Sequence, residues 1–212
     1  MRCGVDEAGR GSVMGPLVVG AVFVESEEPL TTIGVRDSKK LTPKRREAMY
    51  DEITSVADWT VVVATAADID LRRKSMSLNE VELRMFAEAC SHAPTGTVYA
   101  DCPDVNEAAF SQRLGALVPH ADIIAKHKAD DTYPVVSAAS IVAKVTRDRM
   151  MDDIRAEFGV NIGSGYPSDH YTMDFIAGWI KENGKAPDHV RCSWEPVRQM
   201  LSVRKNTKIS DW

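Results

Sequence analysis

The chain has 212 residues and a mass of 23.3 kDa, with 44% hydrophobic and 27% charged residues. This composition excludes disordered, collagen-like and disulfide-scaffold proteins, and the length suffices to bury a sizeable core. The formal net charge of −5 and the isoelectric point near 5.6 argue mildly against a nucleic-acid-binding protein, because phosphate contacts favour a basic surface.

The cysteines and the N-terminus indicate an intracellular protein. The four cysteines have no metal-binding spacing, and the first ten residues already carry several charged side chains, unlike a signal peptide. No apolar run approaches the roughly 20 residues that cross a bilayer. We therefore expect a cytoplasmic protein with reduced thiols and no membrane partner.

The first third of the chain predicts strands. Residues 2–7 precede a glycine-rich turn, and residues 17–24 form a strongly β-forming run, so these two segments are expected to pair as antiparallel neighbours. Residues 59–65 predict a third strand.

The middle of the chain alternates between helix and strand. Apolar residues at helical spacing, opened by a capping-box-like Ser77, predict a helix over 77–90. Strands follow at 97–100 and 121–125, and a long helix is expected over 135–158. This order predicts an α/β fold with one mixed sheet and helices packed on it.

The last fifty residues contain no convincing strand and predict helices over 169–181 and 194–204. The chain is accordingly divided into an α/β domain over 1–160, a C-terminal helical region over 161–205 and a tail over 206–212.

Acidic residues stand at the ends of predicted strands. Asp6 and Glu7 end the first strand, Asp101 ends another, and Asp130 and Asp131 follow the next. If these strands are neighbours, the carboxylates converge, and a hard divalent cation such as Mg²⁺ or Mn²⁺ would neutralise them. The alternative is structural, because Asp is common in turns and caps.

Two glycine-rich segments could approach a ligand. Gly9, Arg10 and Gly11 could present backbone N–H groups to phosphate or sugar oxygens, or could form a tight turn. Tyr166, in the loop 163–169, could stack on a sugar or base, or pack on the helical region.

Basic residues accumulate in two other segments. Residues 36–47 include Ser38 and Lys39 and hold six basic residues against two acidic ones, which suits a phosphate track or a solvated helix face. Ser140 and Lys144 are spaced i, i+4 and therefore share one helix face, where they could bind a phosphate or serve close helix packing.

Five motifs in order resemble the ribonuclease HII family, in its archaeal form. They are Asp-Glu-Ala-Gly-Arg-Gly at 6–11, Asp-Ser-Lys-Lys-Leu at 37–41, Lys-Ala-Asp at 128–130, Ser-Ala-Ala-Ser-Ile-Val-Ala-Lys at 137–144 and Gly-Ser-Gly-Tyr-Pro-Ser-Asp at 163–169. Each motif alone is weak, but their order and spacing hold over nearly the whole chain.

The resemblance implies a ribonuclease H-like fold, with a mixed five-stranded sheet flanked by helices and a C-terminal helical region. It implies a metal-dependent endoribonuclease that cuts the RNA strand of RNA–DNA hybrids and incises duplex DNA at single ribonucleotides. Two Mg²⁺ or Mn²⁺ ions would act during catalysis and leave 5′-phosphate and 3′-hydroxyl ends. It also implies a monomer.

Site residues carry over by motif. The resemblance implies that Asp6, Glu7, Asp101 and Asp130 are catalytic metal ligands. It implies that the substrate is bound by Gly9, Arg10, Gly11 and Tyr166, which sense the ribonucleotide sugar, and by Ser38, Lys39, Ser140 and Lys144, which contact phosphates.

Two departures from the family pattern matter. Asp131 directly follows Asp130, where the family more often has a small residue, so the fourth carboxylate is ambiguous by one position. The tail resembles the motif by which archaeal relatives dock on the sliding clamp, through Asn206, Ile209 and Trp212. That motif prefers Gln first and an aromatic pair last, so a frayed tail is the alternative.

Two other functions remain as alternatives: a DNA nuclease or resolvase on the same fold, and a non-catalytic hybrid-binding protein. The glycine loop and Tyr166 argue against the first, and the presence of all four carboxylates argues against the second. The charge argument also weakens, because residues 181–212 hold seven basic and four acidic residues. The distribution of charge therefore matters more than its sum.

Overall fold

The computed structural model describes residues 1–35, 41–93 and 95–207, with the backbone alone for 204–207. It divides into two compact units, each assembled from segments that are distant in the sequence. The sheet unit comprises Met1–Ala8, Val18–Val63 and Ser77–Thr146, and the helical unit comprises Gly9–Leu17, Ala64–Met76 and Arg147–Trp212. The boundaries predicted after residues 160 and 205 stay a prediction.

The sheet unit is built on five strands in the order β3-β2-β1-β4-β5. β1 pairs with β2 in antiparallel register and with β4 in parallel register, and β4 pairs with β5 in parallel register. The sheet is therefore mixed, as predicted. The strands are β1 (Arg2–Ala8), β2 (Leu17–Val24), β3 (Asp58–Ala64), β4 (Gly96–Asp101) and β5 (Ala121–Lys126).

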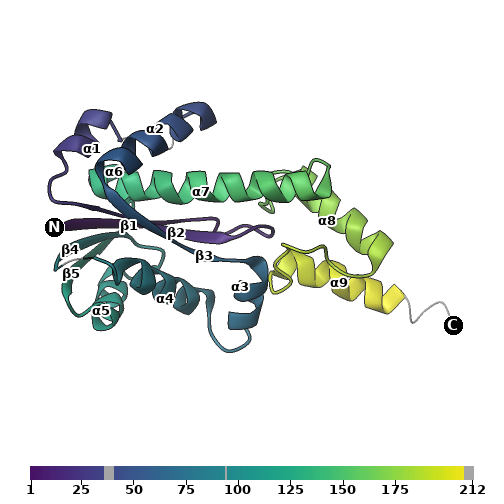
Figure 1. Ribbon diagram of the computed structural model, residues 1–212. Coiled ribbons are helices and arrows are strands. Elements are labelled where there is room, and N and C mark those ends of the chain that lie inside the picture. Colours follow the sequence, from purple (N-terminus) through teal and green to yellow (C-terminus); the bar gives the residue numbers. More distant parts are fainter. Residues whose placement is uncertain (36–40, 94, 208–212) are drawn as a thin grey trace. The chain divides into compact units, whose positions relative to one another are not determined.

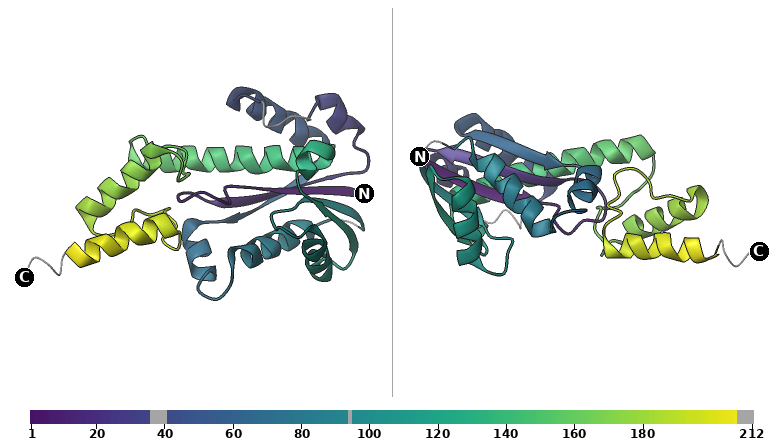
Figure 2. Two further views of the ribbon diagram at one scale, coloured as in Figure 1. Left: turned by 180° about the vertical axis from the view of Figure 1, so that it is seen from behind. Right: turned by 90° about the horizontal axis from the view of Figure 1, so that it is seen from below.

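Helices cover both faces of this sheet. Figure 1 shows α1, α2 and α7 on one face and α4 and α5 on the other, and the view from behind in Figure 2 agrees. All eight residues of β2 are buried, which explains its continuous apolar sequence. The helices are α1 (Glu28–Ile33), α2 (Pro43–Val56), α4 (Leu78–Cys90), α5 (Glu107–Leu117), α6 (Ala129–Thr132) and α7 (Pro134–Phe158).

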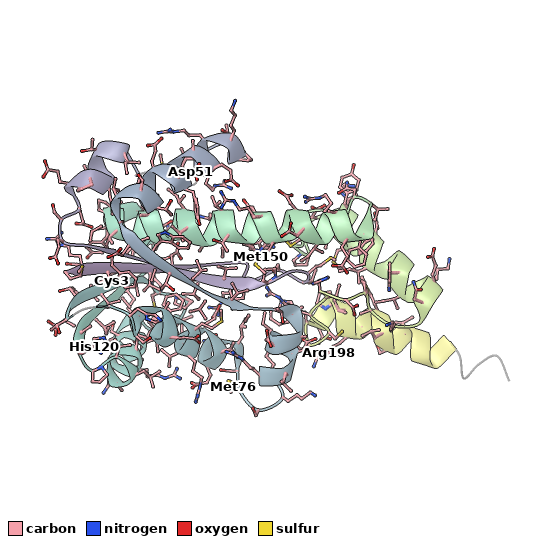
Figure 3. All side chains as sticks on the ribbon, in the orientation of Figure 1. Cys3, Asp51, Met76, His120, Met150 and Arg198 are labelled. Carbon is pink, nitrogen blue, oxygen red and sulfur yellow. The ribbon has the colours of Figure 1, made fainter. Side chains whose placement is uncertain are left out.

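Each face of the sheet has its own apolar contacts. On the α7 side, Val135, Ile141 and Val142 belong to one buried cluster with residues of β2 and α2. On the other side, Phe86 of α4 and Phe110 of α5 meet edge to face, with ring centroids 5.6 Å apart. Cys3, which is labelled in Figure 3, is buried on β1.

Two glycines let α7 lie directly on the sheet. A Cβ atom on Gly4 of β1 would stand 2.2 Å from the backbone of Val135, and one on Gly20 of β2 would stand 2.8 Å from the carbonyl oxygen of Ala139. Real Cβ atoms do not approach backbone so closely, so both positions require glycine. Since Gly20 is the register partner of Asp6, this contact brings α7 beside the part of β1 that carries Asp6.

The helical unit contains α3 (Ala66–Arg72), the C-terminal part of α7, α8 (His170–Asn183) and α9 (Glu195–Thr207). Its core includes Met14, Met151, Ile162 and Ile176. The segment after the glycine loop joins this unit through an isolated bridge between Met14 and Val190.

The structure confirms the predicted strands and the four longer predicted helices to within a few residues. Ser77 caps α4 by accepting a hydrogen bond from the Glu80 N–H, as its position suggested. Helices α1, α3, α5 and α6 were not predicted, and α2 was noted only as a basic stretch. Among the described residues, no helix is both long enough and apolar enough to span a membrane.

Candidate active site

Two of the predicted carboxylates lie side by side at the carboxyl ends of parallel strands. Val5 of β1 and Ala100 of β4 are register partners, so the residues that follow them, Asp6 and Asp101, stand at the same edge of the sheet. Glu7 follows Asp6 in β1, and its N–H donates to Asp6 Oδ1 at 2.7 Å. The adjacency of strands that the sequence could only suggest is present in the fold.

The fourth predicted carboxylate reaches this edge through a tight turn. Lys128 adopts a left-handed conformation with φ 56°, which turns the chain from β5 into α6. The N–H of Ala129 then donates to Asp101 Oδ1 at 2.8 Å, which fixes the start of α6 beside β4. Asp130 is buried and Asp131 is exposed, so the structure supports Asp130 as the inward carboxylate of the pair.

Burial and like charge dominate the electrostatics of this edge. The pKa of Asp6 is raised well above its ordinary value of 3.8, first by burial and then by the charges of Glu7 and Asp101. A carboxylate held in such surroundings is stabilised by a bound cation, and oxygen ligands are those that Mg²⁺ and Mn²⁺ prefer. The chemical type of these donors therefore suits a divalent metal ion.

The ligand set itself is not shown. Within the described residues, no three Asp, Glu, His or Cys side chains are grouped closely enough to hold an ion. The assignment of Asp6, Glu7, Asp101 and Asp130 as metal ligands therefore stays a prediction.

Ser140 and Lys144 face Asp6 from α7. The Ser140 hydroxyl is buried and hydrogen-bonds to Asp6, and the Lys144 ammonium donates to Ser140 Oγ at 3.0 Å. Both side chains lower the pKa of Asp6 and so oppose part of the shift caused by burial. The structure gives these residues a contact with the carboxylate, while their predicted contacts with phosphates remain untested.

The glycine loop belongs to the helical unit. Gly9 has φ 88°, and a Cβ atom there would stand 2.5 Å from both Pro16 O and Arg147 Nε. Gly11 lies outside the left-handed region, and a Cβ atom on it would meet no atom of the described residues within 4 Å, chain neighbours excepted. Gly9 is thus required by the fold, whereas the absence of a side chain at Gly11 leaves open space beside the loop.

The loop that carries Tyr166 is bonded to the segment that follows the glycine loop. The N–H groups of Val13 and Met14 donate to Gly165 O at 2.8 and 3.1 Å. Arg147 places its guanidinium 4.8 Å from the centroid of the Tyr166 ring and donates to Ser164 O at 3.2 Å. The structure therefore brings Tyr166 and the glycine loop into one unit.

Two buried arginines in this unit were missed by the sequence reasoning. Arg147 and Arg191 are 5% and 0% exposed, and Arg191 donates to the carbonyl oxygens of Gly9, Arg10 and Gly15. In the sequence, Arg191 stood out only as one of the seven basic residues of 181–212, and Arg147 carried no assigned role. No sequence pattern marks Arg191, because its partners are main-chain carbonyls more than 170 positions away.

Several predicted residues are not placed. Ser38, Lys39, Ile209 and Trp212 lie outside the described residues, and only the backbone of Asn206, within α9, is described.

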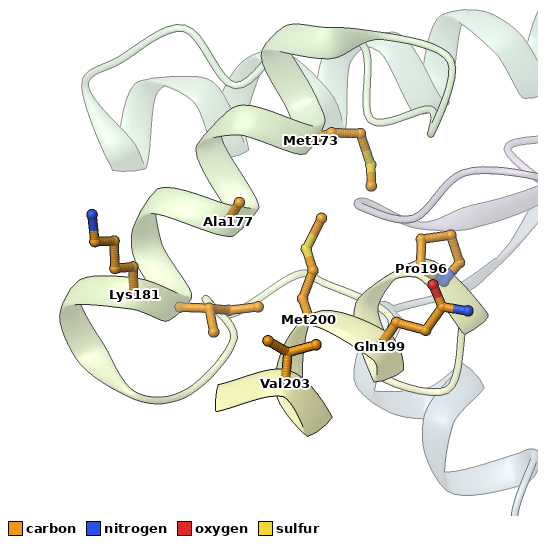
Figure 4. A pocket seen from close by; sticks show the side chains of 8 residues that line it. Met173, Ala177, Lys181, Pro196, Gln199, Met200 and Val203 are labelled. Carbon is orange, nitrogen blue, oxygen red and sulfur yellow. The ribbon is translucent and has the colours of Figure 1, made fainter. Parts of the chain in front are cut away.

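A groove of about 610 Å³ between α8 and α9 is lined mainly by apolar side chains, including Met173 and Met200 (Figure 4). It contains none of the predicted catalytic residues.

Comparison with known proteins identifies the family of this chain. The profile of the family described as ribonuclease HII matches residues 3–197. The ribonuclease HII of Thermococcus kodakarensis is 46% identical over 213 residues, which cover 98% of this chain and 92% of that protein.

Solved structures agree. The ribonuclease H2 of Pyrococcus horikoshii shares 40% identity and a TM-score of 0.90, covering 96% of this chain and 98% of that one. The ribonuclease HII in a complex with PCNA from Archaeoglobus fulgidus shares 38% identity and a TM-score of 0.88, covering 94% and 96%. The predicted mixed five-stranded fold and the resemblance noted in the sequence are thereby confirmed.

Proposed function

The chain belongs to the ribonuclease HII family and is a metal-dependent ribonuclease H, and we propose that it also incises duplex DNA at single embedded ribonucleotides. The observation that carries the catalytic part is that Asp6 and Asp101 directly follow the register partners Val5 and Ala100 on adjacent parallel strands. Glu7 and the start of α6 lie beside them. This edge concentrates carboxyl groups whose negative charge a bound divalent cation would neutralise.

The proposed metal ligands are Asp6, Glu7, Asp101 and Asp130. Two bound Mg²⁺ or Mn²⁺ ions would activate a water for in-line attack and stabilise the leaving 3′ oxygen, leaving 5′-phosphate and 3′-hydroxyl ends. The chain's own contribution is to hold the carboxylates in place. Ser140 forms a hydrogen bond with Asp6, the Lys144 ammonium donates a hydrogen bond to Ser140, and the Ala129 N–H donates one to Asp101.

Selectivity for RNA is proposed to come from the loop of Gly9, Arg10 and Gly11 together with Tyr166. The 2′-hydroxyl distinguishes RNA from DNA at a given nucleotide, and it can bond to main-chain groups only where the backbone approaches closely. The open space beside Gly11 supports this role. The hydrogen bonds between the Tyr166 loop and the segment after Gly11 support a role in selectivity that Tyr166 shares with the glycine loop.

We further propose that the protein acts as a monomer in the cytoplasm and that its tail, 206–212, docks on a sliding clamp. The relative from Archaeoglobus fulgidus was solved in complex with PCNA, which supports a clamp partner. Phosphate contacts by Ser38, Lys39, Ser140 and Lys144 belong to the same proposal.

A cleavage assay with matched variants tests the proposal. Three duplexes of one sequence are compared in Mg²⁺ or Mn²⁺: an RNA–DNA hybrid, a DNA duplex with one ribonucleotide, and an all-DNA duplex. We expect the wild type to cut the first two, Asp130→Asn to be inactive, and Asp131→Asn, the exposed neighbour, to remain active. Equal cutting of the all-DNA duplex would favour a DNA nuclease, and binding without cleavage would favour a hybrid-binding protein.

A further inference from the structure

Arg191 holds the glycine loop from inside the helical unit. Its side chain is fully buried, and its guanidinium donates to Gly9 O at 2.7 Å, to Arg10 O at 3.0 Å and to Gly15 O at 3.1 Å from two nitrogens. The guanidinium also lies 4.8 Å from the centroid of the Trp194 ring. One planar group with fixed donors thus connects both ends of the loop that leads from β1 to β2.

These bonds fix the N–H groups of the loop as well as its carbonyls. The C=O of Gly9 and the N–H of Arg10 belong to one planar trans peptide, and they point in opposite directions. The same holds for the C=O of Arg10 and the N–H of Gly11. By binding both carbonyls, Arg191 directs the Arg10 and Gly11 N–H groups away from itself and holds them there.

Arginine suits this task better than lysine. Its fork presents several donors in a rigid plane, so three carbonyl oxygens can be bound at once, whereas an ammonium is a single point donor on a flexible stem. Trp194 limits the rotation of the plane by stacking on it. The positive charge of the buried Arg191 guanidinium is stabilised by the dipoles of the main-chain carbonyls, and this interaction is stronger in the buried environment.

We infer that Arg191 is a positioning residue for RNA selectivity: it orients the Arg10 and Gly11 N–H groups toward the 2′-hydroxyl of the ribonucleotide. This inference rests on the proposed function, because it presumes that the glycine loop reads that hydroxyl. Arg191 itself need not touch the substrate. Its loss should therefore weaken discrimination between RNA and DNA more than it weakens binding of nucleic acid as such.

The test measures binding in the Asp6→Asn background, so that substrate is not cut. Dissociation constants are measured for a DNA duplex with one ribonucleotide and for the same duplex without it, and their ratio gives the preference. Arg191→Lys keeps the charge, and Arg73→Lys is the matched control because Arg73 also stacks on Trp194, at 4.9 Å. We expect Arg191→Lys to lower the preference about tenfold, and Arg73→Lys to leave it unchanged.

Hydrogen exchange and a second variant provide two further tests of the role of Arg191. Amide hydrogen exchange over residues 9–15 should accelerate in Arg191→Lys and not in Arg73→Lys. If Arg191→Lys does not fold, Trp194→Leu loosens the same guanidinium without removing it and should lower the preference about threefold. A preference equal to that of the parent in the folded variant would overturn the inference.

The outcomes separate the two proposals. If the Asp6→Asn parent shows no preference for the ribonucleotide duplex, the proposed role of the glycine loop fails before Arg191 is considered. If the parent shows the preference and both Arg191→Lys and Trp194→Leu retain it, the loop reads the sugar without help from Arg191. A parallel loss of affinity for both duplexes would assign Arg191 a structural role only, and this also contradicts the inference.

Discussion

The two glycines of the glycine loop, Gly9 and Gly11, should respond in opposite ways to the same substitution. Gly9 adopts φ 88°, and a Cβ atom there would stand 2.5 Å from Pro16 O, an oxygen of the rigid main chain. Gly11 has an ordinary backbone conformation and open space around it. Alanine at position 9 therefore tests the fold, and alanine at position 11 tests the substrate site.

The magnitudes follow from these surroundings. At Gly9, left-handed strain costs about 1–2 kcal/mol and the steric overlap about 1–3 kcal/mol, which together lower the free energy of unfolding by about 2–5 kcal/mol. For a chain of this size, the melting temperature should fall by at least about 4 °C. Gly11→Ala should change stability by less than about 0.5 kcal/mol, as expected for an exposed site without strain.

The assay combines thermal unfolding with cleavage of a duplex that carries one ribonucleotide. Gly11→Ala should melt with the wild type but lose about tenfold or more in kcat/KM, because the added methyl group displaces the sugar from the loop. Wild-type cleavage by Gly11→Ala would refute the contact between loop and sugar. An unchanged melting temperature for Gly9→Ala would refute the account of strain.

Three further predictions concern the carboxylates and the tail. Because the pKa of Asp6 is raised in the folded state, its neutral form contributes stability that is complete below pH 3.8 and is lost as the pH rises through the folded-state pKa. The Asp6→Asn variant, which cannot ionise at this position, should therefore have a higher melting temperature than the metal-free wild type. The difference in melting temperature should grow from pH 4 to pH 8. A difference that shrinks with pH would contradict this sign. Ser140→Ala should raise the Mg²⁺ or Mn²⁺ concentration for half-maximal activity about tenfold, since it removes a bond to a proposed ligand, whereas an unchanged metal requirement with a higher KM would favour the phosphate role. Deleting 206–212 should abolish binding to a sliding clamp and leave cleavage of short duplexes intact, and equal clamp binding would retire the tail motif.

The sequence predicted the parts of the fold that depend on local pattern. The apolar runs of β1, β2, β4 and β5 and the helical spacing of α4 and α7 are visible without contacts. Asp6, Glu7 and Asp101 were placed correctly on their strands, whereas Asp130 lies on α6, a helix that was not predicted. Helix α2 buries only three residues, Met49, Tyr50 and Ile53, so its periodicity is weak, and α6 has only four residues. Such short or weakly amphipathic helices are set by tertiary packing, which local pattern does not report.

The site could be predicted as a set of residues but not as an arrangement. Gly20 lets α7 pack closely beside Asp6 because Gly20 and Asp6, 14 residues apart, are register partners in β2 and β1. The contact between Arg191 and Gly9 O joins residues separated by 182 positions. Long-range contacts of this kind are created by the fold, so a single sequence shows the groups and not their partners.

The product ends formed at a single embedded ribonucleotide report on the proposed metal-dependent cleavage. Mapping both strands of a cut duplex at nucleotide resolution, with and without Mg²⁺ or Mn²⁺, shows where and how the phosphodiester breaks. We expect metal-dependent incision at the ribonucleotide in one strand, with 5′-phosphate and 3′-hydroxyl ends. A 2′,3′-cyclic phosphate end, formed when the sugar's own 2′-hydroxyl attacks, or cleavage without a divalent ion, would contradict it.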